Sequence, residues 1–227
     1  MPSERPTRTP TASPHRSVPP PPARPRDADA PRARLLDAAE RLFAKKGLDG
    51  TRLREVAEGA NATVPLLCHH FDNKDTLYAA VIDRGMERFA DLGWGALGHG
   101  RGIAEQIVAF VEGLLDLASR EPQVTALLHR EMTEGGERAA GLAERWLIPL
   151  RDAAIDAVRS AQSRGEVRPS VDPEMLVLHL SGAILYPSLA APMVEAVWGS
   201  DPLADDFIAR RKRALVDLIL PLVVSAR

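Results

Sequence analysis

Hydrophobic residues recur along this chain at spacings of three and four, which is the period of a helix with one buried face. The first strongly periodic stretch begins after Pro31 and stops at Gly47, a residue type suited to ending a helix. No segment shows the two-residue alternation of a half-buried strand. The pattern therefore predicts an all-α fold. The apolar positions of this first helix are Leu35, Leu36, Ala39, Leu42 and Phe43.

Three shorter periodic stretches follow. Thr63 can cap a very short third helix with its hydroxyl, and Pro65 falls in the first turn, where a missing N–H costs nothing. Asn73 is expected to cap a fourth helix that starts at Lys74. The second helix, just before these, has its apolar face at Leu53, Val56, Ala57 and Ala60.

The chain beyond Gly85 predicts five or six further helices, because Gly and Pro interrupt the periodic pattern repeatedly. We expect the last two helices at about residues 173–196 and 204–224. The expected breaks are at residues 93–102, near Pro122, and at 135–136, 165–169 and 199–202.

Composition divides the chain into three parts. Residues 1–30 hold nine of the nineteen prolines and almost no large apolar side chain, so they are expected to form a disordered tail. Residues 31–84 are expected to form one small domain, and residues 85–227 a larger one. Basic residues outnumber acidic ones by five to three in residues 1–31, whereas residues 85–227 carry fifteen basic and twenty acidic groups. A polyanionic partner should therefore bind toward the N-terminus.

The single cysteine excludes an internal disulfide, and no signal peptide or membrane-spanning apolar run is recognisable. We therefore expect a cytoplasmic protein that has no contact with a membrane and needs no cofactor.

Cys68, His69 and His70 look at first like a reactive or metal-binding cluster. Successive residues on a helix point about 100° apart, so these side chains diverge. A cysteine nucleophile needs a base within hydrogen-bond reach, and a metal needs ligands on one face. The sequence therefore predicts neither a catalytic nor a metal site, and Cys68 is expected to be a small buried hydrophobic residue.

The segment "LREVAEGANATVPLLCHHF" instead matches a helix-turn-helix, in which the N-terminal residues of the second helix meet base edges in the major groove. Val64, Pro65 and Leu66 can offer apolar contacts to thymine methyl groups. The residues expected along the phosphate-facing surface are Arg52, Arg54, Thr63, His69, His70 and Lys74.

The run "ARLLDAAERLFAKKGLDGTRLREVAEGANATVPLLCHHFDNKDTLYAAVID", residues 33–83, resembles the N-terminal domain of the TetR family of bacterial transcriptional regulators. The resemblance implies a three-helix DNA-binding domain followed by a helical ligand-binding and dimerisation domain. It also implies a homodimer that represses by binding a palindromic double-stranded DNA operator until a small-molecule effector releases it.

This chain departs from the family pattern at three places. Arg52 stands where Ser or Thr is usual, so the capping box with Glu55 is expected to be absent. Tyrosine is common in the family at the positions of Cys68 and His70, where it often touches a backbone phosphate. His70 could keep that contact, whereas Cys68 could not. Residues 64–66 are unusually apolar for the family.

The segments "REMTEGGERAA", "DPEMLVLHLSGAILYPSLAAP" and "WGSDPL" resemble the effector domain of one TetR subgroup. The resemblance implies a cavity among the middle helices and a four-helix dimer interface built from the last two. The absence of a dense His/Cys/Asp cluster in this half favours a small organic effector over a metal. Arg130 and Glu131 are either part of the pocket or a solvated face. The candidate ligand-binding residues are His129, Met132, Trp146, His179 and Tyr186.

Two other classes of protein remain open from the residues alone. An all-α enzyme would place convergent acid, base or metal groups on the middle helices. A protein-protein adaptor would keep the dimer interface but would no longer bind DNA.

Overall fold

A computed structural model of the chain describes residues 30–98, 100–134 and 136–224. The described residues are helical, apart from loops and one isolated antiparallel bridge between Val167 and Val224. The all-α prediction is therefore confirmed. The tail predicted at residues 1–30 lies outside the described residues except for Ala30.

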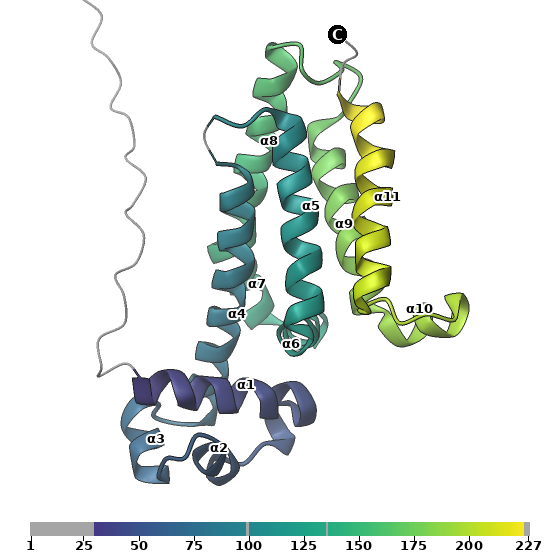
Figure 1. Ribbon diagram of the computed structural model, residues 1–227. Helices are drawn as coiled ribbons and strands as arrows, with labels where there is room; N and C mark the ends of the chain where they lie inside the picture. Colours follow the sequence, from purple (N-terminus) through teal and green to yellow (C-terminus); the bar gives the residue numbers. More distant parts are fainter. Residues whose placement is uncertain (1–29, 99, 135, 225–227) are drawn as a thin grey trace, which may run out of the picture.

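The first three helices form a small unit at the end of the molecule farthest from the C-terminus (Figure 1). They are α1 (Ala30–Gly50), α2 (Leu53–Gly59) and α3 (Val64–His70). Gly47 interrupts α1 with a φ of 73°, and a Cβ there would lie 2.7 Å from Nη1 of Arg130 on α6, so this kink requires glycine. Side chains with no exposed surface hold the unit together, namely Leu35, Phe43, Val56 and Leu67.

Local hydrogen bonds begin each helix. The Thr63 hydroxyl accepts a hydrogen bond from the Leu66 N–H at 3.3 Å, and Asn73 Oδ1 accepts one from the Thr76 N–H at 2.9 Å. Both predicted caps are therefore confirmed. The capping box of α2, expected to be absent, is half present, because Glu55 Oε2 accepts a hydrogen bond from the Arg52 N–H at 3.3 Å. Only the other half of the capping box is lost, since an arginine side chain has no acceptor.

Helix α4 (Lys74–Ala96) leaves the small unit and continues into the rest of the molecule without a break (Figure 1). The boundary that we placed between residues 84 and 85 therefore falls inside a helix rather than in a linker. One rigid element thus belongs to both parts.

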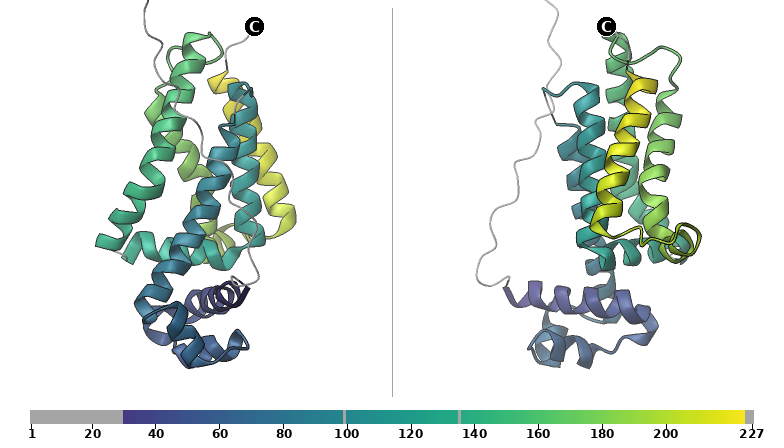
Figure 2. Two further views of the ribbon diagram at one scale, coloured as in Figure 1. Left: turned by 90° about the vertical axis from the view of Figure 1, so that its left-hand side faces the viewer. Right: turned by 45° about the vertical axis from the view of Figure 1, so that its right-hand side comes forward.

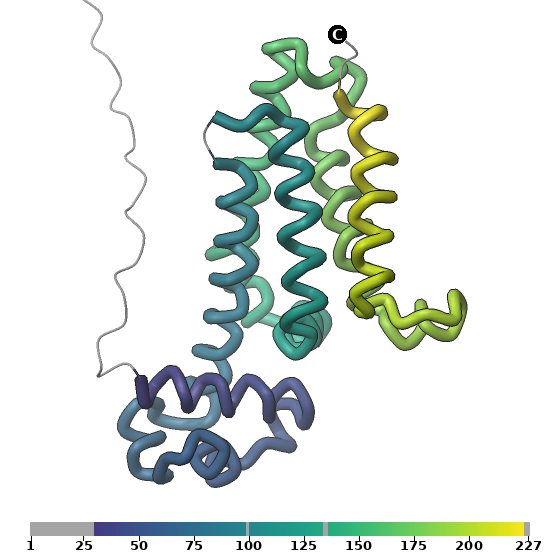
Figure 3. The backbone as a smooth tube through the Cα atoms, viewed as in Figure 1, coloured from purple at the N-terminus to yellow at the C-terminus, as the bar shows by residue number. Residues whose placement is uncertain are grey.

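Seven α-helices follow α4 in the described part of the chain, one more than the upper expectation. Helices α4, α5, α8, α9 and α11 run along the length of a bundle, whereas α6 crosses beneath them next to α1 (Figure 2). Helix α10 projects sideways from the bundle (Figure 3). Their bounds are α5 (Ile103–Arg120), α6 (Pro122–Glu134), α7 (Glu137–Leu142), α8 (Ile148–Ser163), α9 (Pro173–Leu189), α10 (Ala191–Trp198) and α11 (Asp205–Val223).

The single helix expected at residues 173–196 is wrong, because the chain bends by 81° between α9 and α10. Pro192 in the first turn of α10 has no N–H with which to continue the hydrogen bonding of α9 across the bend. Pro187 lies inside α9 and likewise cannot donate a hydrogen bond to the carbonyl of Ala183. Arg211 Nη2 on α11 takes up that acceptor at 3.1 Å. Among the described residues no single helix is long and apolar enough to cross a membrane, and only α9 with α10, taken as a bent pair, has the length and composition to do so.

A five-residue π-helical segment, Ala143–Leu147, joins α7 to α8. Trp146 in this segment donates from Nε1 to Asp83 Oδ1 on α4 at 3.4 Å. One turn further, Leu150 packs so closely on α4 that a Cβ on Gly93 would lie 2.5 Å from it. The connection therefore presses against α4 at two levels.

Candidate functional sites: a helix-turn-helix surface and an apolar cavity

Helix α3 presents its first turn to solvent. Val64 is 37% exposed, Pro65 is exposed and Leu66 is half-buried. Leu67 is fully buried and anchors the helix on the small core. The Thr63 cap fixes the direction from which the chain enters the helix. The residues predicted to meet bases thus share one exposed end of a short, well-anchored helix.

The cations predicted to meet phosphates flank this turn in sequence. Arg52 at the start of α2 is exposed and Lys74 at the start of α4 is half-buried, and neither takes part in an ion pair among the described residues. Arg54 is engaged by Glu58 at 2.8 Å, and this carboxylate raises the pKa of the Arg54 guanidinium. That exposed pair is easily exchanged for a phosphate contact.

The Cys68, His69 and His70 cluster has no geometry for chemistry. The two imidazole rings are edge-on at 5.4 Å, and no group of three potential metal ligands occurs among the described residues. Cys68 is exposed, so its prediction as a buried residue is wrong. The reason is that Leu67 and Phe71 already fill the buried face of α3. His69 is exposed and His70 half-buried, which leaves both available to a partner.

The bundle encloses a cavity of about 860 Å³ between α4, α5, α6, α8 and α9. A cavity of this size is within the range of small-molecule sites. Its interior is formed by aliphatic and aromatic side chains. Those that define its walls are Phe89, Ile107, Phe110, Leu114, Leu128 and Ile155.

The cavity opens mainly between α8 and α9, where most of its solvent-exposed lining residues lie; Met132 on α6 is also exposed. Arg151 is paired with Asp152 at 2.7 Å. Arg159 is paired with Asp156 at 3.5 Å and with Glu174 at 3.2 Å. The mouth is thus charged, and each of its charged groups has an oppositely charged partner, with Arg159 shared by two carboxylates.

Of the five predicted ligand-binding residues, Met132 lines this cavity and the other four do not. His129 is half-buried on α6, and Trp146 packs against the core of the small unit. His179 and Tyr186 are exposed on α9. The structure therefore does not bring the five together.

Sequence reasoning missed three uncharged polar residues in the lining: Gln106, Thr125 and Ser181. Gln106 carried a usable signal, because it lies between Ile103, Ile107 and Phe110 at helical spacing and so interrupts an apolar face. The other two are small polar residues of ordinary kind, and no sequence pattern marks them.

Helix α6 connects the cavity to the small unit through a buried carboxylate. Glu131 is only 2% exposed, accepts a hydrogen bond from the Tyr78 hydroxyl at 3.0 Å, and pairs with Arg138 Nε at 3.0 Å. Tyr78 in turn packs edge-on against Phe43 of α1, with ring centroids 5.0 Å apart. Burial, reinforced by Glu131, raises the pKa of the Tyr78 phenol well above its usual range. Glu131 is therefore neither a solvated residue nor part of the cavity lining.

A second charged network joins the same elements. Glu40 on α1, 7% exposed, accepts hydrogen bonds from Arg84 at 2.7 Å and Arg88 at 3.1 Å on α4. Arg88 also pairs with Glu121, which directly precedes α6. Ion pairs thus tie α1 to α4, and α4 in turn to the residue that precedes α6.

These features define a class of protein. A small helix-turn-helix unit with an exposed reader helix is joined by a shared helix and by buried polar contacts to a bundle with an apolar cavity. Comparison with known proteins agrees with this description. Residues 35–81 match the family described as "Bacterial regulatory proteins, tetR family", and residues 102–210 match "Tetracyclin repressor-like, C-terminal domain".

The chain is similar along most of its length to characterised regulators. It is 30% identical to the HTH-type transcriptional repressor SCO4008 of Streptomyces coelicolor over 198 residues, which cover 85% of this chain and 98% of that one. It is 26% identical to the HTH-type transcriptional regulator UidR of Escherichia coli K12, covering 70% and 82%. A solved structure of AibR in complex with isovaleryl coenzyme A and operator DNA has a TM-score of 0.66 at 25% identity, covering 85% and 98%.

The chain belongs to the tetR family of bacterial regulatory proteins. It is a DNA-binding transcriptional regulator and not an enzyme.

Proposed function

We propose that the protein is a homodimeric repressor that binds a palindromic operator through α3 and is released from it when a small organic molecule fills the bundle cavity. One observation carries this proposal: α6 lines the cavity through Thr125, Leu128 and Met132, and holds the DNA-binding unit through the neighbouring Glu131. A ligand that displaces α6 must also disturb the contacts of Tyr78 with α1. Relatives agree with both halves, since SCO4008 is named a repressor and AibR was solved with an acyl-coenzyme A and operator DNA.

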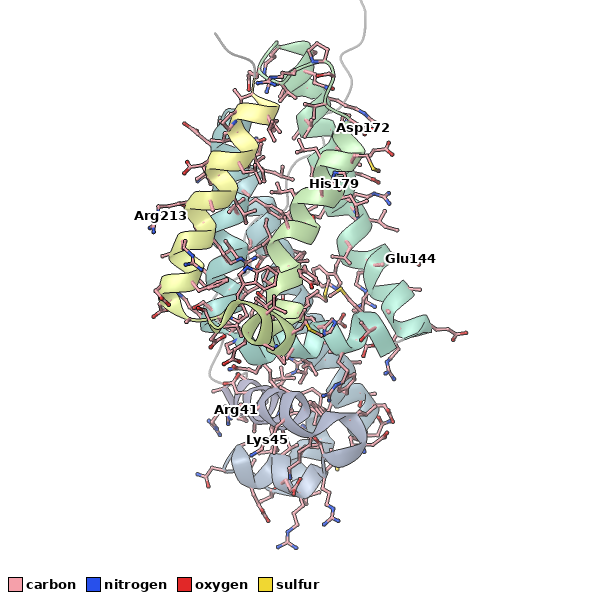
Figure 4. All side chains as sticks on the ribbon, turned by 90° about the vertical axis from the view of Figure 1, so that its right-hand side faces the viewer. Arg41, Lys45, Glu144, Asp172, His179 and Arg213 are labelled. Atoms are coloured by element: carbon pink, nitrogen blue, oxygen red, sulfur yellow. The ribbon has the colours of Figure 1, made fainter. Side chains whose placement is uncertain are left out.

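The homodimer is supported by an apolar surface on α9 and α11. Leu218 and Leu222, one turn apart on α11, are 61% and 59% exposed, and Tyr186 on α9 is 57% exposed. Gly182 and Ala183 next to them are small and exposed, which suits close helix packing. Figure 4 looks onto the side of the bundle that carries these two helices. Exposed apolar residues in adjacent rows of this kind mark protein interfaces.

Base contacts are assigned to Val64, Pro65 and Leu66 in this proposal. The phosphate contacts are assigned to Thr63, His69, His70 and Lys74, together with the two arginines of α2, Arg52 and Arg54. A dimer places two copies of α3 in successive major grooves, so half-sites should lie about 34 Å or somewhat more apart.

The test combines oligomeric state with footprinting on DNA upstream of the protein's own gene. We expect a dimer at micromolar concentration that protects a palindrome. Leu218→Glu should give a monomer with strongly reduced operator affinity, because it buries a charge in the interface. Ile148→Glu, a change at an exposed aliphatic residue on α8, is the matched control and should remain dimeric. A wild-type monomer that protects no palindrome would refute the proposal, and a dimer that binds no DNA would favour an adaptor.

A further inference from the structure

We infer that the molecule received by the cavity is an elongated, uncharged lipophile rather than an anion such as an acyl-coenzyme A. This inference rests on the proposed function, because it names the class of effector for the same cavity. It differs from what the AibR complex alone would suggest, since coenzyme A carries several phosphates.

The charged residues of the lining offer no unpaired cation to an anionic ligand. No Lys or His lines the cavity, and its two arginines, Arg151 and Arg159, are both at the mouth. Each is already matched by carboxylates at 2.7–3.5 Å, as described above. Three carboxylates against two guanidiniums leave the mouth with one excess negative charge. A phosphate or carboxylate would meet no unpaired cation there. These exposed pairs can be exchanged, but each exchange would leave the freed carboxylate beside the anion in a mouth that already has excess negative charge.

The interior of the cavity has polar side chains but no charged ones. Away from the mouth the polar side chains are Gln106, Thr125 and Ser181, which can donate and accept hydrogen bonds but carry no charge. The Thr125 hydroxyl also has a distant backbone partner, the Glu121 carbonyl at 3.5 Å. An ion transferred into such an interior loses its hydration without gaining a counter-charge. A hydroxyl, ketone, ester or amide of an otherwise apolar molecule would be satisfied by these residues.

The cavity is elongated along the helices of the bundle. Its lining extends along α4 from Met86 to Ala96 and along α5 from Ile103 to Ala118. At about 1.5 Å of rise per residue these stretches are roughly 15 and 22 Å long. The cavity is therefore a channel parallel to the helices, suited to a long alkyl chain or a row of fused rings.

Two fluorescent probes that share one set of aromatic rings test the charge preference on the full-length protein. N-phenyl-1-naphthylamine is uncharged, whereas 8-anilino-1-naphthalenesulfonate adds a sulfonate, and both brighten in apolar surroundings. We expect the neutral probe to bind at least about tenfold more tightly, because the sulfonate loses its hydration without a counter-charge. Equal or tighter binding of the sulfonate would overturn the inference.

Competition for the neutral probe extends the test to the opposite charge. At equal chain length, 1-dodecanol should displace it better than either dodecanoate or dodecylammonium. A winning dodecylammonium would overturn the inference in favour of a cationic effector.

A variant with a new charge ties the preference to this cavity. Gln106→Arg places a cation in the lining and should shift the ratio of the two probe affinities by about tenfold or more toward the sulfonate, because the sulfonate then has a partner. Gln106→Met, of similar size and uncharged, should leave the ratio near that of wild type. Ser181→Arg and Ser181→Met repeat the comparison from α9, should a change at Gln106 impair folding. A ratio unaffected in both arginine variants would place the probes elsewhere and overturn the inference.

These measurements need no DNA, so they fail independently of the proposed function. If the neutral probe binds as expected but neither it nor dodecanol releases any DNA, the ligand class stands and the release mechanism fails. If only anions release DNA, the inferred ligand class is wrong and the proposed repressor function is retained.

Discussion

The DNA-binding unit and the cavity bundle are built in opposite ways, although α4 belongs to both. In the unit, α1, α2 and α3 close around side chains with no exposed surface, such as Val56 and Leu67. In the bundle, α4, α5, α6, α8 and α9 enclose about 860 Å³ of space. A packed interior holds one geometry, whereas a hollow one leaves its helices room to rearrange. The DNA-binding unit is therefore a closed, packed body, and the bundle keeps open space between its helices.

The largest effect should come from removing the same ring in each region. Phe43→Ala empties the fully packed core and should lower the free energy of unfolding by about 3–5 kcal/mol. Phe110→Ala only widens an existing cavity from a half-buried position and should cost roughly 1–2 kcal/mol. Chemical denaturation followed by circular dichroism measures both. Equal losses would show that the bundle is as tightly packed around Phe110 as the unit is around Phe43.

The reader helix should yield a second, smaller effect. Val64→Ala should change base preference at one operator position by about 1–3 kcal/mol and leave stability nearly unaltered, because Val64 is exposed. Binding to a panel of single-base operator variants measures this.

Lys74→Ala serves as the contrasting control. It should weaken operator and random DNA alike and reduce the slope of log affinity against log salt by about one. If Val64→Ala weakened binding to operator and to random DNA equally, Val64 would contribute to packing and not to base recognition.

The junction between the two regions should respond to alkaline pH. The folded state raises the pKa of Tyr78, first through burial and then through Glu131. This contribution to stability is present below about pH 10, where the phenol of the unfolded chain is still protonated. It is lost as pH rises above that value. Tyr78→Phe should lower the free energy of unfolding by about 1–2 kcal/mol at neutral pH. The same change should also abolish the decrease in stability that Tyr78 causes above about pH 10.

Ultraviolet absorption can follow this titration directly. In a Tyr186→Phe background Tyr78 is the sole tyrosine of the chain. Its tyrosinate band should appear only as the protein unfolds. Ionisation near pH 10 in the folded protein would show that the contact with Glu131 is loose.

The smallest effect should come from Cys68. Its side chain is exposed on α3, so Cys68→Ser should change operator affinity by no more than about threefold and leave stability within about 0.5 kcal/mol. Filter binding and thermal unfolding measure the two. A loss beyond tenfold would make Cys68 a DNA contact rather than a bystander.

Sequence alone predicted the DNA-binding unit far better than the cavity. The helices and caps at Thr63 and Asn73 depend on residues three or four positions apart, and those signals lie in one short window. The cavity depends on which residues face one another across five helices, so Gln106 and Ser181 were missed while His179 was proposed and lies on the outside. The bend after α9 was missed although Pro192, in the first turn of α10, is a local signal for a helix boundary. Pro187 gives the same signal but lies inside α9, where Arg211, 24 residues later in the sequence, compensates for its missing N–H.

The π-helical segment Ala143–Leu147 sets the rotational phase between α7 and the two contacts that follow on α4. Trp146 meets Asp83, and Leu150, four residues later on the same face, meets Gly93 and the cavity. A π-turn accommodates one more residue than an α-turn. Deleting Ala143 would rewind the segment as an α-helix and rotate the preceding turn by about 100°. The insertion or loss of a single residue at that point would therefore change how α6 and α7 meet α4, while the residues of α3 and of the cavity lining stayed the same.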